Sequence, residues 1–334
     1  MSSINTNASA MTALQTLSAT NKALATTQNR IATGFRVAEA SDNAAYWSIA
    51  TTMRSDNKAL STVKDALGLG AAKVDTAYTG VNAAIDVVNE IKSKLVAARE
   101  PGVDRTKIQA EITQLQSQLT SNASAVTFSG ENWLSVDSSA TGYSATKSIV
   151  ASFTRASDGS VSVGTISINT ASMTLFDAAT NVNDGTGVGI LDAKYTAAAI
   201  AGPPAFAAGD RITDQTTALS TTVFTVTSLN ISALTSSATD MGYLEGYIKG
   251  VDNALSRMTT AASDLGSAKK RIDIQSTFVS NLMDTIDRGV GQLVDADMNK
   301  ESTRLQALQV QQQLGIQALS IANSNTQSIL SLFR

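Results

Sequence analysis

The chain has 334 residues, enough for two or three domains, with a net charge of −3 and neither histidine nor cysteine. Hydrophobic residues make up 43% but aromatic residues only 5%, which favours helix-on-helix packing over an aromatic-lined pocket. This composition excludes disulfides, thiol catalysis and histidine-based sites, and it indicates no nucleic-acid surface. We therefore expect no catalytic residue, no metal ligand and no bound cofactor. The sequence contains no run of eighteen apolar residues, so we expect no membrane-spanning helix. Residues 1–21 contain no Lys or Arg, whereas a cleavable secretion signal would begin with basic residues.

The N-terminal segment predicts a helix over residues 4–33. Leu17, Leu24 and Ile31 follow one another at seven-residue spacing, and Gly34 interrupts the pattern. Residues 36–46 are polar and aperiodic, so we expect a connecting stretch there.

A long helix is predicted from residue 46 or 56 to residue 99. Its apolar positions recur at strict seven-residue steps, at Leu60, Leu67, Val74, Val81, Val88 and Leu95. Pro101 and Gly102 end this helix, and either Asp104 or Thr106 can cap a third helix.

The middle of the chain, from Gly130 to about Ala238, is dense in Ser, Thr, Gly and Asp. The segment Ile149–Phe153 and the apolar residues of 161–168 flank Asp158 and Gly159, which predicts a β-hairpin. Residues 222–231 predict another strand, and residues 181–189 and 201–209 predict loops. This region reads as a small β-containing insert.

Seven-residue periodicity returns from Asp240 and continues past Leu293. The apolar positions are Leu244, Val251, Met258, Leu265, Ile272, Val279, Ile286 and Leu293. A last helix is predicted over residues 300–333. Two long ladders far apart in the chain need partners for their apolar faces, so they are expected to pair with each other. The predicted fold is mainly α: a long antiparallel, coiled-coil-like helical bundle of N- and C-terminal segments, with a small β-containing middle insert.

Both ends of the chain are almost free of charge. Lys22 is the only charged residue among the first 29, and residues 305–333 contain none. Solvent-exposed helices are normally rich in Lys and Glu, so uncharged amphipathic ends predict burial against copies of the same chain. The residues predicted to form this assembly interface are Ile4, Met11, Leu14, Leu17, Leu24, Ile31, Leu305, Leu308, Leu314, Ile316, Leu319, Ile329 and Leu330.

The composition of the ends is compatible with two alternatives. A terminal helical hairpin could dock on the protein's own body instead of on copies. A membrane-surface helix is disfavoured, because the polar faces lack the Lys and Arg that anionic lipids attract.

Several segments of the ends resemble bacterial flagellin. The matching segments are Ile4–Asn7, Asn29–Arg36, Asp42–Ala45, Ile49–Ala50, Ile108–Thr113, Phe128–Gly130, Gln311–Asn323 and Leu330–Arg334. The similarity covers roughly residues 1–135 and 240–334, and its departures from the common pattern resemble the rhizobial branch. The resemblance implies a secreted, extracellular subunit that polymerises helically into the flagellar filament for swimming motility.

The resemblance also implies three domains. These are a terminal-helix domain of residues 1–44 and 296–334 that lines the inner filament tube, a rod-like domain of residues 45–175 and 236–295, and a small outer domain of residues 176–235. The implied partners are copies of the chain, an export chaperone, the filament cap and hook-junction proteins, with no nucleic acid and no membrane.

Host immune receptors are further partners that the resemblance implies, with weak recognition. Residues 29–50 correspond to the peptide that plant receptors detect in this family, and they differ from the usual pattern at Ala38, Glu39, Ser41, Asn43, Tyr46 and Trp47. Residues 89–95 correspond to the patch sensed by the animal receptor, and Glu90 stands where an Arg is usual.

The sequence thus predicts a structural filament subunit, with a hook–filament junction protein of the same apparatus as the nearest alternative. From another class of protein, an enzyme or receptor-binding module in the β insert is a weaker alternative, because histidine and cysteine are absent.

Overall fold

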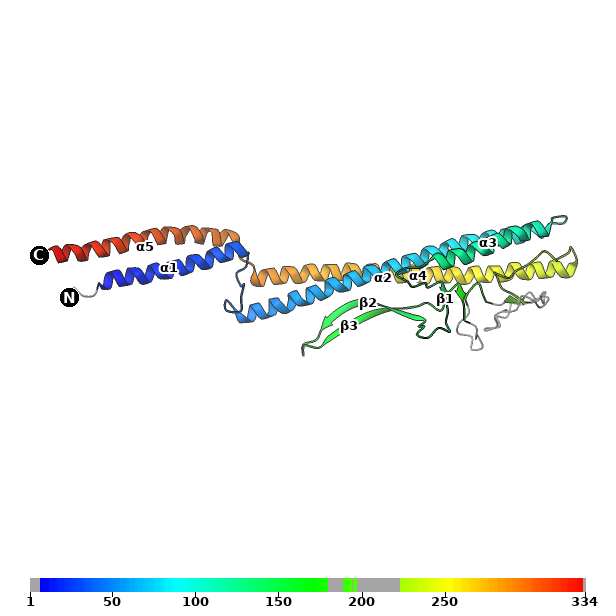
Figure 1. Cartoon of the computed structure of the whole chain (residues 1–334), viewed down its shortest axis with the longest axis horizontal. Coiled ribbons are helices and arrows are strands. Elements are labelled where there is room, and N and C mark those ends of the chain that lie inside the picture. Colours follow the sequence, from blue (N-terminus) through cyan, green and yellow to red (C-terminus); the bar gives the residue numbers. More distant parts are fainter. Residues whose placement is uncertain (1–6, 180–188, 194, 197–222, 333–334) are drawn as a thin grey trace. The chain divides into compact units, whose positions relative to one another are not determined.

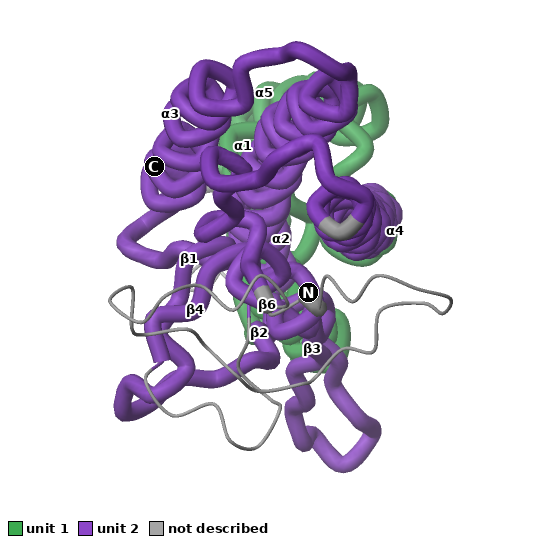
Figure 2. Tube along the Cα trace, turned by 90° about the vertical axis from the view of Figure 1, so that its right-hand side faces the viewer, with its two compact units in different colours: residues 1–59, 281–334 green, residues 60–280 purple. Residues whose placement is uncertain are grey.

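The computed structural model describes residues 7–179, 189–193, 195–196 and 223–332. The chain groups into two units, one of residues 1–59 and 281–334 and one of residues 60–280 (Figure 2). The three-domain division made from the sequence follows other boundaries and remains a prediction. The predicted loop at 201–209 and almost all of the one at 181–189 lie outside the described residues.

In the first unit, helix α1 (Ala8–Thr33) lies beside helix α5 (Met298–Leu332) and runs antiparallel to it (Figure 1). The side chain of Asn7 caps the start of α1 by accepting from the amide of Ala10, and Gly34 ends that helix with a left-handed φ of 76°. Asp297 caps α5 by accepting from the amides of Asn299 and Lys300. Caps therefore fix both ends of α1 and the start of α5.

Beyond these helices, the first unit has a small core of its own. The amides of Arg36 and Val37 donate to the carbonyl of Val294, and the amide of Ala296 donates to the carbonyl of Gly34. Four buried residues form the core: Val37, Ala50, Val290 and Val294. The segments that follow α1 and precede α5 are thus tied together by both backbone and apolar contacts.

Helices α2 (Ala44–Ala97) and α4 (Ala238–Val294) contribute residues to both units, and within the second unit they bury the predicted ladders. The last two ladder positions, Ile286 and Leu293, belong to the first unit and are half-buried against its core. Leu67, Val74 and Leu95 on α2 and Leu244, Val251 and Leu265 on α4 are all fully buried. Ion pairs join Asp75 to Lys269, Lys92 to Asp252 and Arg99 to Glu245. From one ion pair to the next, the residue number on α4 falls by the same amount as the residue number on α2 rises. Helices α2 and α4 are therefore antiparallel and keep one register. The long helical pair is confirmed.

Helix α3 (Arg105–Ala125) is capped by Asp104, whose carboxylate accepts from the amides of Thr106 and Lys107. Arg105, in the first turn of α3, is buried. Its guanidinium donates to the carbonyl of Ala98 at 3.0 Å and to that of Leu234 at 3.1 Å. Arg105 therefore joins the end of α2 to the segment that precedes α4.

The predicted hairpin is present as β2 (Thr146–Arg155) and β3 (Val161–Asn169). The pairing register shifts between Val150 and Ser152, so Ala151 forms a bulge. The carbonyl of Ala151 accepts a hydrogen bond of 2.9 Å from the side-chain amide of Gln275 on α4. Ile166 and Ile168 are buried, whereas Val161 and Val163 lie on the exposed face. The apolar side chains of β3 therefore change from the exposed face of the hairpin to its buried face between Val163 and Ile166.

The predicted strand at 222–231 is wrong for most of its length. Strand β6 (Val223–Phe224) is short and pairs with β5 (Tyr195–Thr196). After β6, side chains of α3 satisfy the backbone: the Gln116 amide donates to the carbonyls of Val226 and Leu229, and Gln109 accepts from the amide of Ile231. The short parallel pair of β1 (Ser135–Val136) and β4 (Phe176–Asp177) was not predicted from the sequence either.

Candidate assembly surface

The predicted interface residues fall into two groups, and the first lies in the contact between α1 and α5. This contact is called the seam below. Leu308 is buried, and the side chain of Leu17 lies 3.3 Å from the Cβ that a side chain at Gly315 would have. The other predicted residues of the seam, all half-buried, are Leu24, Ile31, Leu305 and Leu319.

The second group points away from the seam. Met11 and Leu14 on α1 are 59% and 57% exposed, and Leu314 and Ile316 on α5 are 57% and 54% exposed. Shallow hollows run along α1 beside Met11, Leu14, Ser18 and Lys22. Large apolar side chains that remain this exposed in a single chain indicate a surface that another molecule covers.

Two residues of the exposed face were not predicted from the sequence. Val310 and Ile321 are 55% and 64% exposed. They lie four residues before and seven after Leu314, which puts all three on one side of α5, opposite the seam. We call Val310, Leu314 and Ile321 the outward stripe. A helical projection with Leu308 placed inward would have identified it.

Three predicted residues are not placed. Ile4 lies outside the described residues, and Ile329 and Leu330 belong to α5 but their side chains lie outside what the structure describes.

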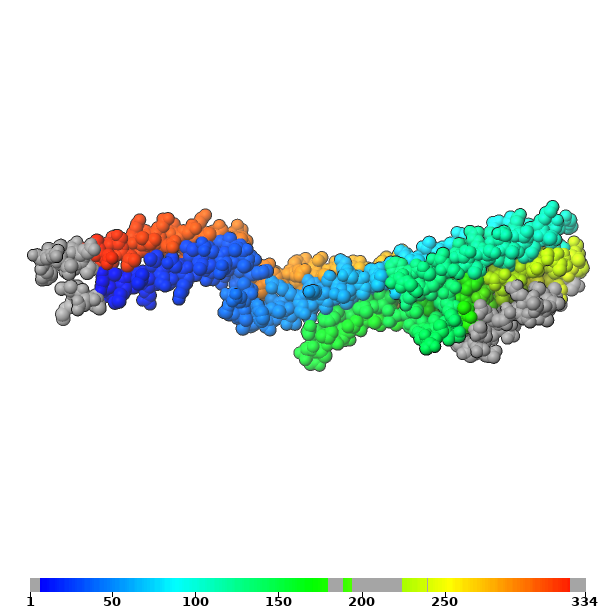
Figure 3. All heavy atoms as spheres, in the orientation of Figure 1, coloured from blue at the N-terminus to red at the C-terminus, as the bar shows by residue number. Residues whose placement is uncertain are grey.

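Polar contacts also join α1 to α5. Arg30 and Glu301 form an ion pair at 3.3 Å. The Asn7 amide donates to the carbonyl of Ala322 at 3.0 Å, and the Gln312 amide donates to the side-chain oxygen of Asn21 at 2.8 Å. Figure 3 shows the atoms of α1 and α5 in contact along the pair.

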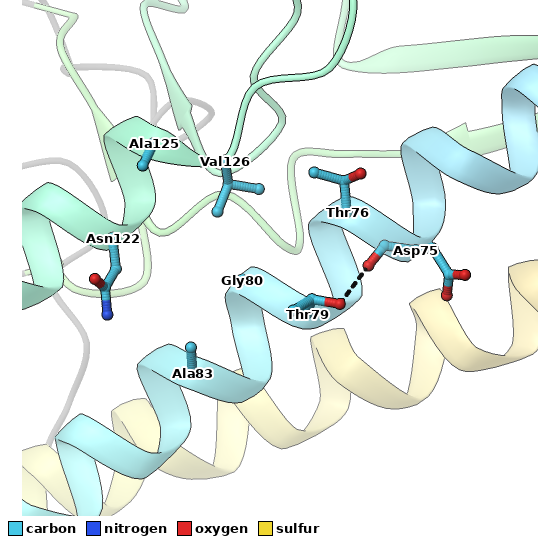
Figure 4. Close-up of a pocket in the computed structure, with 8 residues that line it drawn as sticks. All are labelled: Asp75, Thr76, Thr79, Gly80, Ala83, Asn122, Ala125 and Val126. Carbon is cyan, nitrogen blue, oxygen red and sulfur yellow. Dashed lines mark hydrogen bonds between the residues drawn. The ribbon is translucent and has the colours of Figure 1, made fainter.

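The second unit has a surface groove between α2 and α3 (Figure 4). Val126 reaches close to α2 there, because a Cβ at Gly80 would lie 2.6 Å from its side chain. The hydroxyl of Thr79 donates to the backbone of Asp75 in its own helix. No group of three or more acidic side chains that could hold a metal ion occurs in the described part of the chain.

Residues 89–95, which the sequence predicts to correspond to the animal-receptor patch, contribute to a local charge network. Lys94 pairs with Glu111 at 2.8 Å and with Glu90 at 3.5 Å. The hydrogen bond from Lys94 to Glu111, and then the charge of Glu111, raise the pKa of Lys94 above its usual value. Lys94 therefore pairs with two carboxylates, those of Glu111 and Glu90.

Within residues 29–50, which the sequence predicts to correspond to the plant-receptor peptide, Tyr46 and Trp47 are 41% and 38% exposed. Two of the departures from the usual pattern therefore lie on the surface of the chain.

No helix in the described ranges has a stretch that is both long and apolar enough to cross a membrane. Comparison with known families gives two matches: the bacterial flagellin N-terminal helical region over residues 4–139, and the C-terminal helical region over residues 248–333. The first region contains α1 to α3, and the second contains most of α4 and all of α5.

Known relatives are similar over their full length. Flagellin C of Rhizobium meliloti (strain 1021) is 53% identical over 334 residues, and flagellin A of the same strain is 51% identical over 403 residues. A flagellin of Brucella melitensis is 46% identical over 335 residues. Each alignment covers all of both chains, and none of these findings favours a hook–filament junction protein. The chain therefore belongs to the bacterial flagellins, as a rhizobial-type structural subunit of the extracellular flagellar filament.

Proposed function

We propose that the chain enters the filament through the outward faces of its terminal helices, with the outward stripe of one copy packed against α1 or α5 of others. The observation that supports this proposal is the exposure of Val310, Leu314 and Ile321, each more than half open to solvent. Burying a side chain of this size contributes about 1.5–3 kcal/mol. Three such side chains, repeated in every subunit, give a substantial drive toward polymerisation.

The lack of charge on these faces supports the same proposal. After Arg304, helix α5 has no charged residue, and its polar positions are mainly Gln, Ser and Asn. These side chains can satisfy one another when they are buried, without the larger desolvation penalty of ions. A helical polymer also needs two different surfaces that complement each other, and α1 and α5 supply two.

The terminal helices, residues 1–44 and 296–334, would then form the inner wall of the filament tube. Residues 45–175 and 236–295 would surround that wall, and residues 176–235 would face outward. Electron microscopy of the purified chain under polymerising conditions tests this arrangement. We expect tubes whose innermost density fits α1 and α5; an inner wall built from other segments would contradict it.

The same uncovered faces suit transient partners before assembly. An export chaperone, the filament cap and hook-junction proteins would each present an apolar surface to α1 or α5. The chain has no cysteine and only three prolines, so it can be kept unfolded and refold quickly after export. We propose a purely structural role, without catalysis.

Host receptors of both kinds are proposed to respond weakly to this chain. The exposed aromatic residues at 46 and 47 would disturb the plant-receptor peptide. In the animal-receptor patch, Glu90 presents a negative charge where an Arg is usual in the family.

Replacing Glu90 with Arg is expected to raise activation of the animal receptor by about tenfold, because one repulsive contact becomes attractive. Glu100→Arg, the same charge reversal at an exposed residue of the turn after α2, is the control and should change activation little. Both variants are compared as purified monomers in a cell reporter assay. Potent activation by the unaltered chain, or equal responses to both variants, would count against the proposal.

A further inference from the structure

The ion pair between Arg30 and Glu301 joins the last turn of α1 to the first turn of α5, and it includes a buried carboxylate. Glu301 is only 7% exposed, and its Oε2 atom is buried without a hydrogen-bond partner. Arg30 lies in the last turn of α1 and Glu301 in the first turn of α5, where the two helix dipoles favour a cation and an anion respectively. Glu301 is also the only acidic residue in either helix.

The Arg30 side chain is 25% exposed, so the ion pair is buried only on the Glu301 side, and a partly buried ion pair with a half-satisfied carboxylate is weak evidence for stability. Replacing such a pair with apolar residues of similar volume is often neutral or stabilising. The best-supported use of a buried polar contact between helices is to fix their alignment, since any other alignment leaves the polar group without its partner.

The apolar residues of the seam specify the alignment poorly, and the hydrogen bond between the side chains of Gln312 and Asn21 is exposed to solvent. Small or similar residues repeat every seven positions: Ala10, Leu17, Leu24 and Ile31 on α1, and Leu308, Gly315 and Ala322 on α5. A shift of seven residues would still bring apolar residues together. In one direction, however, it would place Glu301 opposite Leu24, and in the other it would place Glu301 beyond the end of α1.

We propose that Arg30 and Glu301 are positioning residues that set the register of α1 against α5. This inference deepens the proposed function, because the outward faces form one continuous surface only in a single register. A seven-residue shift would displace the outward stripe by about 10 Å relative to Met11 and Leu14. Neighbouring subunits could not then fit both helices at once.

Engineered cysteines can report the register directly, because the chain contains no native cysteine. In the native register, the Cβ of Leu17 is 3.9 Å from the Cβ position at Gly315, which suits a disulfide. The pair Leu17→Cys/Gly315→Cys therefore reports the native register. The pairs Leu24→Cys/Gly315→Cys and Ala10→Cys/Gly315→Cys report shifts of seven residues in the two directions.

Each cysteine pair is placed in three backgrounds: the unaltered chain, Arg30→Met/Glu301→Leu, and the control Lys300→Met/Arg304→Met. The control removes two exposed charges from the first turns of α5, outside the proposed assembly surface. The protein is oxidised under polymerising conditions, and intrachain disulfides are quantified by peptide mass spectrometry in the pelleted and soluble fractions. Circular dichroism checks that α2 to α4 remain folded.

We expect only the native disulfide in the unaltered chain and in the control. In Arg30→Met/Glu301→Leu, a shifted disulfide should rise about tenfold or more while the yield of filaments falls. The native disulfide alone in that variant would overturn the inference. Loss of every disulfide would also overturn it, since the pair would then hold the helices together and not align them. The proposed function could fail while the register inference holds. In that case the disulfide results would be as expected, but substitutions in the outward stripe would not reduce filament formation.

Discussion

Replacing Leu314 and Ile321 with Ser should raise the critical concentration for filament formation by roughly a hundredfold to ten-thousandfold. The two side chains are 57% and 64% exposed in the single chain, so serine at these positions removes little packing from it. In the filament, each would lose about 1.5–3 kcal/mol of burial. Sedimentation of filaments over a range of protein concentrations measures this change.

Gln309→Ser/Gln313→Ser is the matched control, because it makes a comparable change at two exposed polar positions of the same helix. Its critical concentration should stay close to that of the unaltered chain. Equal critical concentrations for the apolar and polar pairs of substitutions would show that the outward stripe does not contribute to assembly.

Arg105→Met should lower the free energy of unfolding of the second unit by about 3–6 kcal/mol. The substitution keeps much of the volume of the side chain but leaves the carbonyls of Ala98 and Leu234 without their donor. Each loses a hydrogen bond from a charged group, and such bonds are worth about 1.5–3 kcal/mol. Urea unfolding followed by circular dichroism measures the loss.

Lys107→Met on the same helix gives the comparison, because the side chain of Lys107 is 85% exposed. Its effect should stay within about 0.5 kcal/mol. A similar loss in both variants would mean that Arg105 does not clamp the end of α2 to the segment before α4.

The long helices could be predicted because their apolar residues recur at one period over many turns. A fully buried position at every seventh residue, such as Leu67, Val74 and Val81, leaves little choice of structure. The turn at Asp158–Gly159 was predictable for a similar reason, since few residues adopt the left-handed φ of 85° that Gly159 has.

The two faces of the terminal helices could not be separated in the same way. Apolar residues occur all round α5, so Leu308 in the seam and Leu314 in the outward stripe look alike in sequence. Only the observed pairing with α1 distinguishes them. The sequence therefore predicted one set of assembly residues, in which positions of the seam and positions of the exposed faces were not separated.

Side chains that bind distant backbone were the main source of error. Gln109 and Gln116 satisfy the backbone of 226–231, so a segment rich in β-branched residues forms little strand. The burial of Arg105 could not be predicted from its neighbours in sequence, because one of its acceptors, Leu234, comes from a distant part of the chain. Contacts of this kind have no local signature.

The most direct test of coverage by neighbouring subunits is the reactivity of a single cysteine at position 314, made by Leu314→Cys in a chain without native cysteine. Its rate of alkylation is compared between assembled filaments and the same sample after depolymerisation. The proposed packing predicts that assembly slows labelling by about tenfold or more, and that depolymerisation restores the rate. Equally fast labelling in filaments would mean that the face stays open to solvent, and the proposed packing of the terminal helices would be wrong.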